Sequence, residues 1–222
     1  ESFMNTVFMA IVIGIIFFLT GIIFSGNIAT LLGANKQVYH MTSIYLKVLL
    51  MFGPAFVLNN VMNTFVRNDG NPKLSMIAML VGSFGNIILD YLLVIKFSMG
   101  MFGAVLATGF SPIMGLMVLS GHIVSENSNI KFKVAKIRAS FIKSIIMLGI
   151  PSFVTEMSSG IVIFVFNIII LGLQGNVGVA AYGVIANLAL VVISIYTGVA
   201  QGSQPLFSAA YGKNDKKMQK QL

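Results

Sequence analysis

The chain has 222 residues, of which 57% are hydrophobic and only 9% are charged, and its mean hydropathy is +0.93. A soluble globule of this composition would have too few polar side chains to cover its surface, so the composition predicts a membrane protein. The chain contains no cysteine, which excludes disulfides and thiolate metal sites, and its net charge of +8 stands in short loops between apolar runs, which argues against a nucleic-acid partner.

Six apolar runs are long enough to cross a bilayer, which takes about 20 helical residues. They predict an all-α integral membrane protein with spans at 8–32, 43–66, 74–97, 103–124, 141–173 and 179–209. Several glycines and Pro112 dilute the fourth run, although neighbouring helices can satisfy the backbone groups that such residues free. The connections are short, as in a bundle of antiparallel helices, except for residues 125–140.

Positive charges alternate along the connections. One set of loops carries Arg67, Lys73, Lys131, Lys133, Lys136, Arg138, Lys213, Lys216, Lys217 and Lys220, whereas the loops between them carry only Lys36 and Lys96. Because an excess of Lys and Arg marks the cytoplasmic side, we expect the first span to run outward. The 125–140 loop and the C-terminal run are then cytoplasmic.

The long basic loop 125–140 is the predicted boundary between two sub-bundles, with four spans in 1–124 and two in 141–222. It is interpreted as a solvated linker, and contact with anionic membrane lipid is the alternative. The chain begins without Met and stops within a charged run, so we expect a piece of a longer protein. The remaining helices of that protein would then be its partners.

Asp90 lies within the third predicted span, about 16 residues from its start and therefore in its outer half. At 100° per residue one polar strip of this helix collects Ser75, Met79, Gly82, Ser83, Asn86 and Asp90. Ionisable side chains in a span are rare and usually face the bundle interior or a water-filled cavity. Asp90, with Asn86 one turn before it, is thus a candidate cation or proton site. A carboxylate that only fixes helix packing is the alternative.

Glu156 is the second carboxylate within a predicted span. Its helical strip contains Gly149, Ser152, Glu156, Ser159, Gly160, Ile163 and Asn167. Small residues permit close helix approach and the polar side chains offer oxygen ligands, so we expect a role in proton coupling, with a structural polar clasp as the alternative.

Other polar residues have plainer interpretations. Asn59, Asn60 and Asn63 are expected to make packing hydrogen bonds, and the Gly198–Gly202 spacing is one that helix pairs use for packing. His40 and His122 stand near span ends without metal-ligand spacing. Because no catalytic set of residues and no nucleotide-binding loop is present, we expect neither an enzyme nor an ATP-driven pump, and no cofactor.

Five segments together resemble one family. They are Arg67-Asn-Asp-Gly-Asn-Pro-Lys73, Asn86-Ile-Ile-Leu-Asp90, Gly103-Ala-Val-Leu-Ala-Thr108, Ile150-Pro-Ser-Phe-Val-Thr-Glu156 and Gly198-Val-Ala-Gln-Gly-Ser-Gln-Pro205. In this order they resemble the multidrug and toxic compound extrusion (MATE) family, in particular the bacterial branch with DinF-like and MepA-like exporters. The resemblance covers nearly the whole chain.

The resemblance implies a twelve-helix, two-lobe antiporter of the bacterial plasma membrane, of which this chain supplies the third to eighth helices. Such a protein exports amphipathic or cationic drugs in exchange for sodium ions or protons. By the same resemblance, Asn86, Asp90 and Thr108 form the coupling site, with Asp90 as the candidate sodium ligand. The family's further aspartate, on its first helix, is absent here.

The resemblance also covers the second sub-bundle. Glu156 resembles the acidic residue of the seventh helix, although its spacing from Pro151 differs from that of the best-known members. Asn187, Gln201 and Gln204 fall in eighth-helix segments and are candidates for the substrate cavity.

Two other functions fit parts of the pattern. A lipid-linked saccharide flippase on a related fold would need a cavity lined with cations, but the spans offer no inward Arg or Lys beyond Lys47. A membrane scaffold without transport activity would become more stable on loss of both carboxylates and change in no other respect.

Overall fold

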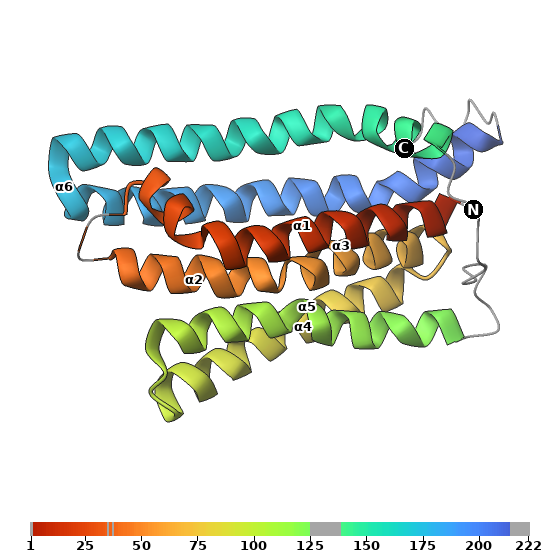
Figure 1. Cartoon of the computed structure of the whole chain (residues 1–222). Coiled ribbons are helices and arrows are strands. Elements are labelled where there is room, and N and C mark those ends of the chain that lie inside the picture. Colours follow the sequence, from red (N-terminus) through yellow and green to blue (C-terminus); the bar gives the residue numbers. More distant parts are fainter. Residues whose placement is uncertain (1, 35, 37, 125–138, 214–222) are drawn as a thin grey trace. The chain divides into compact units, whose positions relative to one another are not determined.

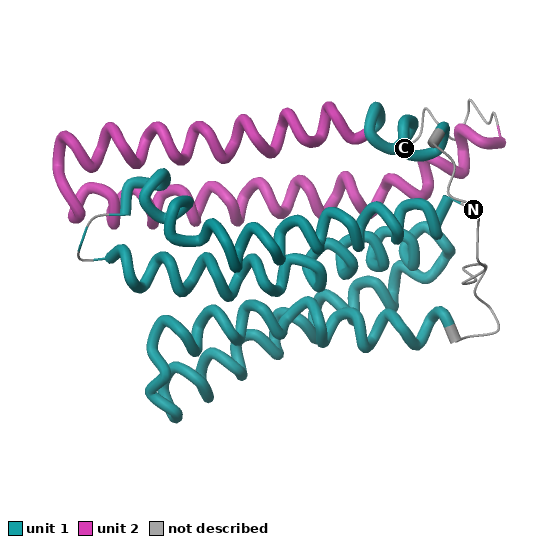
Figure 2. Tube along the Cα trace, in the orientation of Figure 1, with its two compact units in different colours: residues 1–148 teal, residues 149–222 magenta. Residues whose placement is uncertain are grey.

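The computed structural model describes residues 2–34, 36, 38–124 and 139–213, and within these ranges every regular element is a helix. In chain order they are α1 (Ser2–Leu31), α2 (Tyr39–Met51), α3 (Gly53–Asn68), α4 (Pro72–Asp90), the π-helix η1 (Tyr91–Lys96), α5 (Gly100–Val124) and α6 (Ala139–Gly212) (Figure 1). The chain divides into two compact units, residues 1–148 and 149–222 (Figure 2).

The helices are long and apolar enough to cross a membrane. Four of them meet this criterion on their own, namely α1, α4 with η1, α5, and α6, and the bent pair α2–α3 is a fifth candidate. The predicted spans at 8–32, 74–97 and 103–124 correspond to α1, α4–η1 and α5. The fourth span, in spite of its glycines and Pro112, is one continuous helix.

The predicted span 43–66 differs from the structure, because it is two helices that meet at Phe52 with a bend of 46°. Pro54 lies in the first turn of α3, where its missing N–H costs no hydrogen bond. Inside a single helix the same proline would have removed a hydrogen bond and collided with the preceding turn. The chain therefore restarts its helix at Gly53.

A 74-residue helix would be about 110 Å long, far more than a bilayer is thick, and α6 is in fact interrupted. Gly175 has φ 64° and ψ −156°, a conformation that only glycine adopts without strain. It separates the arms 139–174 and 176–212, which match the last two predicted spans. The rings of Phe166 and Tyr182 stack across the turn with centroids 5.7 Å apart, so the arms form a hairpin.

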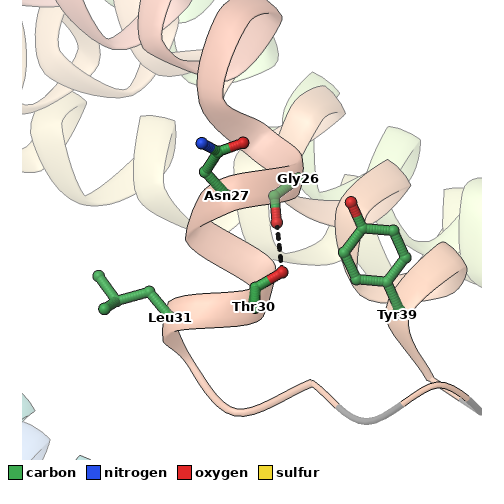
Figure 3. Close-up of a pocket in the computed structure, with 5 residues that line it drawn as sticks. All are labelled: Gly26, Asn27, Thr30, Leu31 and Tyr39. Carbon is green, nitrogen blue, oxygen red and sulfur yellow. Dashed lines mark hydrogen bonds between the residues drawn. The ribbon is translucent and has the colours of Figure 1, made fainter.

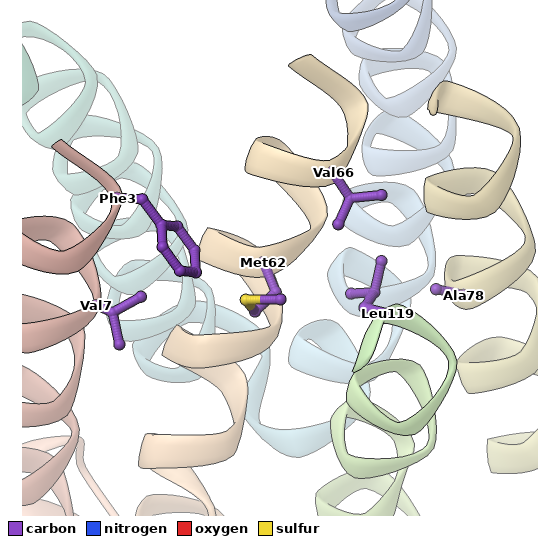
Figure 4. Packing of buried hydrophobic residues seen from close by; sticks show 6 residues of the cluster. All are labelled: Phe3, Val7, Met62, Val66, Ala78 and Leu119. Carbon is purple, nitrogen blue, oxygen red and sulfur yellow. The ribbon is translucent and has the colours of Figure 1, made fainter. Parts of the chain in front are cut away.

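The core of the first unit joins four helices at one end of the bundle. Phe3 and Val7 of α1, Met62 and Val66 of α3, Ala78 of α4 and Leu119 of α5 are buried together (Figure 4). Val66 and Leu119 are fully buried. The same end holds the α3–α4 turn and the end of α5, and it is the predicted cytoplasmic end.

Small residues bring α1 against the α2–α3 pair. A Cβ atom added at Gly14 would lie 2.6 Å from Pro54 Cα, and one added at Gly53 would lie 2.7 Å from Phe17 Cβ. Neither position has room for a side chain. These contacts use the close helix approach that membrane helices achieve with glycine.

Candidate functional site

The site begins with the register of α4 against α5. Ser111 Oγ donates a hydrogen bond to the Gly82 carbonyl oxygen at 2.9 Å, and Cβ atoms added at Gly115 and Gly103 would lie 3.5 Å from Ala78 O and 3.0 Å from Leu93 O. These contacts run in opposite directions along the two helices, which are therefore antiparallel. Residues 86–90 of α4 lie opposite the part of α5 between Gly103 and Ser111, which contains Thr108.

Asn86 and Asp90 are half-buried and one helical turn apart. Asn86 Nδ2 and Asp90 Oδ1 are shielded from solvent, and neither has a hydrogen-bond partner among the described residues. The two ends of an Asn amide are assigned rather than observed, so Asn86 can equally turn its oxygen to this side. The pair then offers two oxygen atoms, the ligand type that hard cations prefer. A lone carboxylic acid oxygen here is equally suited to hold a proton.

Thr108 lies at the level of this pair but is not hydrogen-bonded to it. Its hydroxyl donates to Ala104 O, one turn back in its own helix, at 3.0 Å. The backbone changes directly after Asp90, where α4 gives way to the π-helix η1. Such wide turns in α-helices are frequently found at functional sites. No pattern in the amino-acid sequence indicates this change of helix type.

Only part of the predicted polar strip on α4 is buried. Ser75 and Gly82 are buried and Asn86 and Asp90 half-buried, but Met79 is 56% exposed and Ser83 is also exposed. Ser75 Oγ donates to Asn63 Oδ1 at 2.6 Å, and Asn63 Nδ2 donates to Ser75 O at 3.3 Å. The predicted packing role of Asn63 is thus what the structure shows.

Glu156 belongs to the second unit and is exposed there, as are all residues of 149–162. The neighbouring hydroxyls of Thr155 and Ser159 donate to Pro151 O and Thr155 O, one turn back. Nothing lies within 4 Å of a Cβ atom added at Gly149 or Gly160. The polar strip of this arm is therefore open within its unit.

The three substrate-cavity candidates lie on the second arm of α6. Asn187 Nδ2 donates to Gly183 O at 2.8 Å, and Asn187, Gln201 and Gln204 are exposed. A Cβ atom added at Gly198 or Gly202 would meet nothing within 4 Å, so this GxxxG spacing packs against no described residue.

A buried polar cluster at the other end of the first unit has no counterpart in the sequence-based predictions. His122 Nε2 lies 2.9 Å from Asp69 Oδ2, and the two side chains are only 4% and 11% exposed. Asn71 Nδ2 lies 3.4 Å from His122 Nδ1. The three residues come from the end of α3, the start of α4 and the last turn of α5. Nothing in a sequence window links positions 53 residues apart; the only available signal was that both lie at the predicted cytoplasmic end.

An open pocket of about 390 Å³ lies at the end of α1 next to the start of α2, and it is lined by Gly26, Asn27, Thr30, Leu31 and Tyr39 (Figure 3). Its Thr30 hydroxyl is already bonded to Gly26 O at 3.1 Å, and the lining has no charged group. Among the described residues there is no cluster of three or more His, Cys, Asp or Glu that could hold a metal ion. Asn86 and Asp90 are therefore the candidate ion site of the first unit.

Comparison with known proteins identifies the relatives of the chain. It is 30% identical to the multidrug export protein MepA of Staphylococcus aureus (strain MRSA252) over 215 residues, which is 96% of this chain and 48% of that protein. It is 29% identical to MepA of Staphylococcus saprophyticus, over 91% of this chain and 45% of that protein. The chain thus spans about half the length of the curated relatives it matches. These relatives are bacterial membrane transporters, and the chain is likewise a multi-pass membrane protein.

Solved structures show the same fold. The MATE multidrug transporter DinF-BH, solved in complex with a drug, superposes with a TM-score of 0.86 at 24% identity, over 95% of this chain and 48% of that one. A MOP superfamily transporter from Pyrococcus furiosus gives 0.85 at 23% identity, over 99% and 49%. The MatE family model matches residues 1–92 and 151–222, which is most of the chain. This chain belongs to the MatE family.

Proposed function

We propose that the protein containing this chain is a secondary antiporter that exports amphipathic or cationic drugs and performs no covalent chemistry. Support comes from the family, from the export activity in the names of the MepA relatives, and from the drug bound to one structural neighbour. Export against a gradient requires an energy source. The coupling ion in this proposal is sodium or a proton, and Asp90 receives it.

The observation that carries the proposal is the pair of solvent-shielded polar atoms on Asn86 and Asp90. A polar atom held in an apolar span without a partner is costly, and such residues in membranes usually serve a substrate or ion path. Thr108, at the same level of α5, is a further ligand in the proposal. Glu156 in the second unit is the proposed second acid, and Asn187, Gln201 and Gln204 line the drug cavity.

Ion binding drives export only if the ion has different affinities for the inward-open and outward-open states. In this mechanism the ion occupies Asp90 in one state and leaves it in the other, which couples ion entry to drug release. Loss of the carboxylate removes this difference in affinity. The drug can still bind, but its exit is no longer tied to the ion gradient.

The experiment measures drug efflux by the full-length protein in vesicles, with sodium and proton gradients imposed one at a time. Asp90→Asn should abolish gradient-driven efflux while insertion into the membrane is unchanged. Lys96→Gln is the matched control, because it removes an exposed charge six residues further along and should leave efflux intact. Unchanged efflux in Asp90→Asn would reject the coupling role. Uptake of a lipid-linked saccharide in place of a drug would indicate the flippase instead.

A further inference from the structure

The inference concerns the buried cluster of His122, Asp69 and Asn71, which the proposed transport function does not use. Asn71 is the N-cap of α4: its side-chain Oδ1 accepts a hydrogen bond from Leu74 N at 3.1 Å. This bond fixes the amide orientation, because the oxygen must face Leu74. The NH₂ group of Asn71 is then the one that faces His122 Nδ1, at 3.4 Å.

The two contacts of His122 assign its hydrogens. Asp69 Oδ2 is an acceptor, so Nε2 must carry a hydrogen, and Asn71 Nδ2 is a donor, so Nδ1 must be a bare acceptor. The arrangement is therefore satisfied by the neutral Nε2–H imidazole. Adding a proton at Nδ1 would place one donor against another. The contact to Asp69 would survive, because a carboxylate stabilises an imidazolium.

Protonation can be accommodated only if Asn71 changes. Either its amide turns over, and its oxygen then faces His122 instead of Leu74, or the side chain moves away. In both cases the first turn of α4 loses its cap, which is one of the few partners available to the first N–H groups of a helix. Pro72 follows directly and offers no N–H of its own.

We propose that His122 and Asn71 form a proton-sensitive switch, in which protonation of His122 releases the N-cap of the helix that carries Asn86 and Asp90. Imidazole is the side chain whose charge ordinarily changes between pH 5 and 8. The charged groups around it on the packed elements are Asp69 and Arg67 of α3 and the exposed Lys73 of α4, and α1 carries no ionisable side chain. The switch lies at the predicted cytoplasmic end, so cytoplasmic pH would set it.

The test follows His122 and the Leu74 amide in the full-length protein in lipid nanodiscs. Imidazole ¹⁵N spectra, with the His122 signals assigned by their loss in His122→Gln, should show the Nε2–H tautomer at about pH 8 and both nitrogens protonated at about pH 5.5, on either side of the usual imidazole range. Amide exchange at Leu74, corrected for its intrinsic pH dependence, should become about fivefold faster at the lower pH, the effect of losing a typical N-cap.

Asn71→Ser is the decisive variant, because a serine hydroxyl still caps Leu74 N but cannot read the state of His122. Its exchange at Leu74 should be slow and equal at the two pH values. The proposal is overturned if His122 carries its hydrogen on Nδ1 at the higher pH, or if wild type and Asn71→Ser respond to pH alike. Neither outcome depends on drug efflux, so a failure of the transport proposal would be recognised separately.

Discussion

At the scale of single residues, the polar side chains of the first unit fall into two kinds. Asn63 and Ser75 satisfy each other through two hydrogen bonds, whereas Asn86 and Asp90 each keep a shielded atom without a partner among the described residues. The first pair contributes to stability and the second lowers it. Buried polar groups that lack partners are costly, so their presence in a span points to function rather than packing.

The contribution of the satisfied pair can be measured with Ser75→Ala. The change deprives Asn63 Oδ1 of its donor inside the bundle, which should lower the free energy of unfolding by about 1–3 kcal/mol. Ser83→Ala, at an exposed position of the same helix, should change it by less than about 0.5 kcal/mol. Unfolding in mixed micelles provides the comparison. Equal stability of the two variants would contradict the role assigned to this pair.

Residue-scale prediction from the sequence succeeded where a helical wheel was enough. It placed Asn86 and Asp90 together and assigned Asn63 to packing. It grouped Met79 and Ser83 with them, but both are exposed, because a wheel gives an angle and not the position of the neighbouring helix. It could not find the contact of His122 with Asp69, which depends on how three helix ends meet.

At the scale of elements, hydropathy predicted the number and order of the spans but not their direction. Windows of apolar residues measure length, so 43–66 was predicted as a single span although the helix breaks at Phe52. Gly53 and Pro54 were the available signal for that break. The turn between the last two spans was predicted at 173–178, and Gly175 lies within it. There the sequence carried the information directly, because that conformation requires glycine.

The hairpin of α6 therefore depends on one glycine. Gly175→Ala should destabilise the protein by about 1–3 kcal/mol, since alanine is strained at φ 64° and ψ −156°. Gly172→Ala is the matched control: nothing lies within 4 Å of an added Cβ and the residue is helical, so alanine should stabilise by about 0.5–1 kcal/mol. Thermal unfolding in detergent distinguishes the two. A harmless Gly175→Ala would mean that the turn is not held by this residue.

At the scale of the whole molecule, charge determines orientation in the membrane. The basic loops lie at alternate helix ends, and the ends that carry Arg67, Lys73 and the His122 cluster are predicted to face the cytoplasm. The predicted linker 125–140 lies outside the described residues except for its last two, and the C-terminal basic run outside them except for Lys213. The division between four spans in 1–124 and two in 141–222 therefore stays a prediction.

Orientation can be tested because this chain has no cysteine of its own. In a cysteine-free full-length background, Lys73→Cys should react with an impermeant maleimide only from the cytoplasmic side, and Lys36→Cys only from the outside. Both lysines are exposed, so accessibility of the label is not limiting. The reverse pattern of labelling would invert the topology, and would place the His122 switch on the outer face.

The π-helix η1 has a consequence for how the site is held. Phe97 N–H donates to Leu92 O, five residues back, at 2.9 Å, so each turn beyond Asp90 holds more residues than an α-helical turn. Side chains after Asp90 are therefore rotated away from the positions that a continuous α-helix would give them. The segment contains spare length. Its far tip can swivel by tightening those turns, while Asp90 keeps its register against α5.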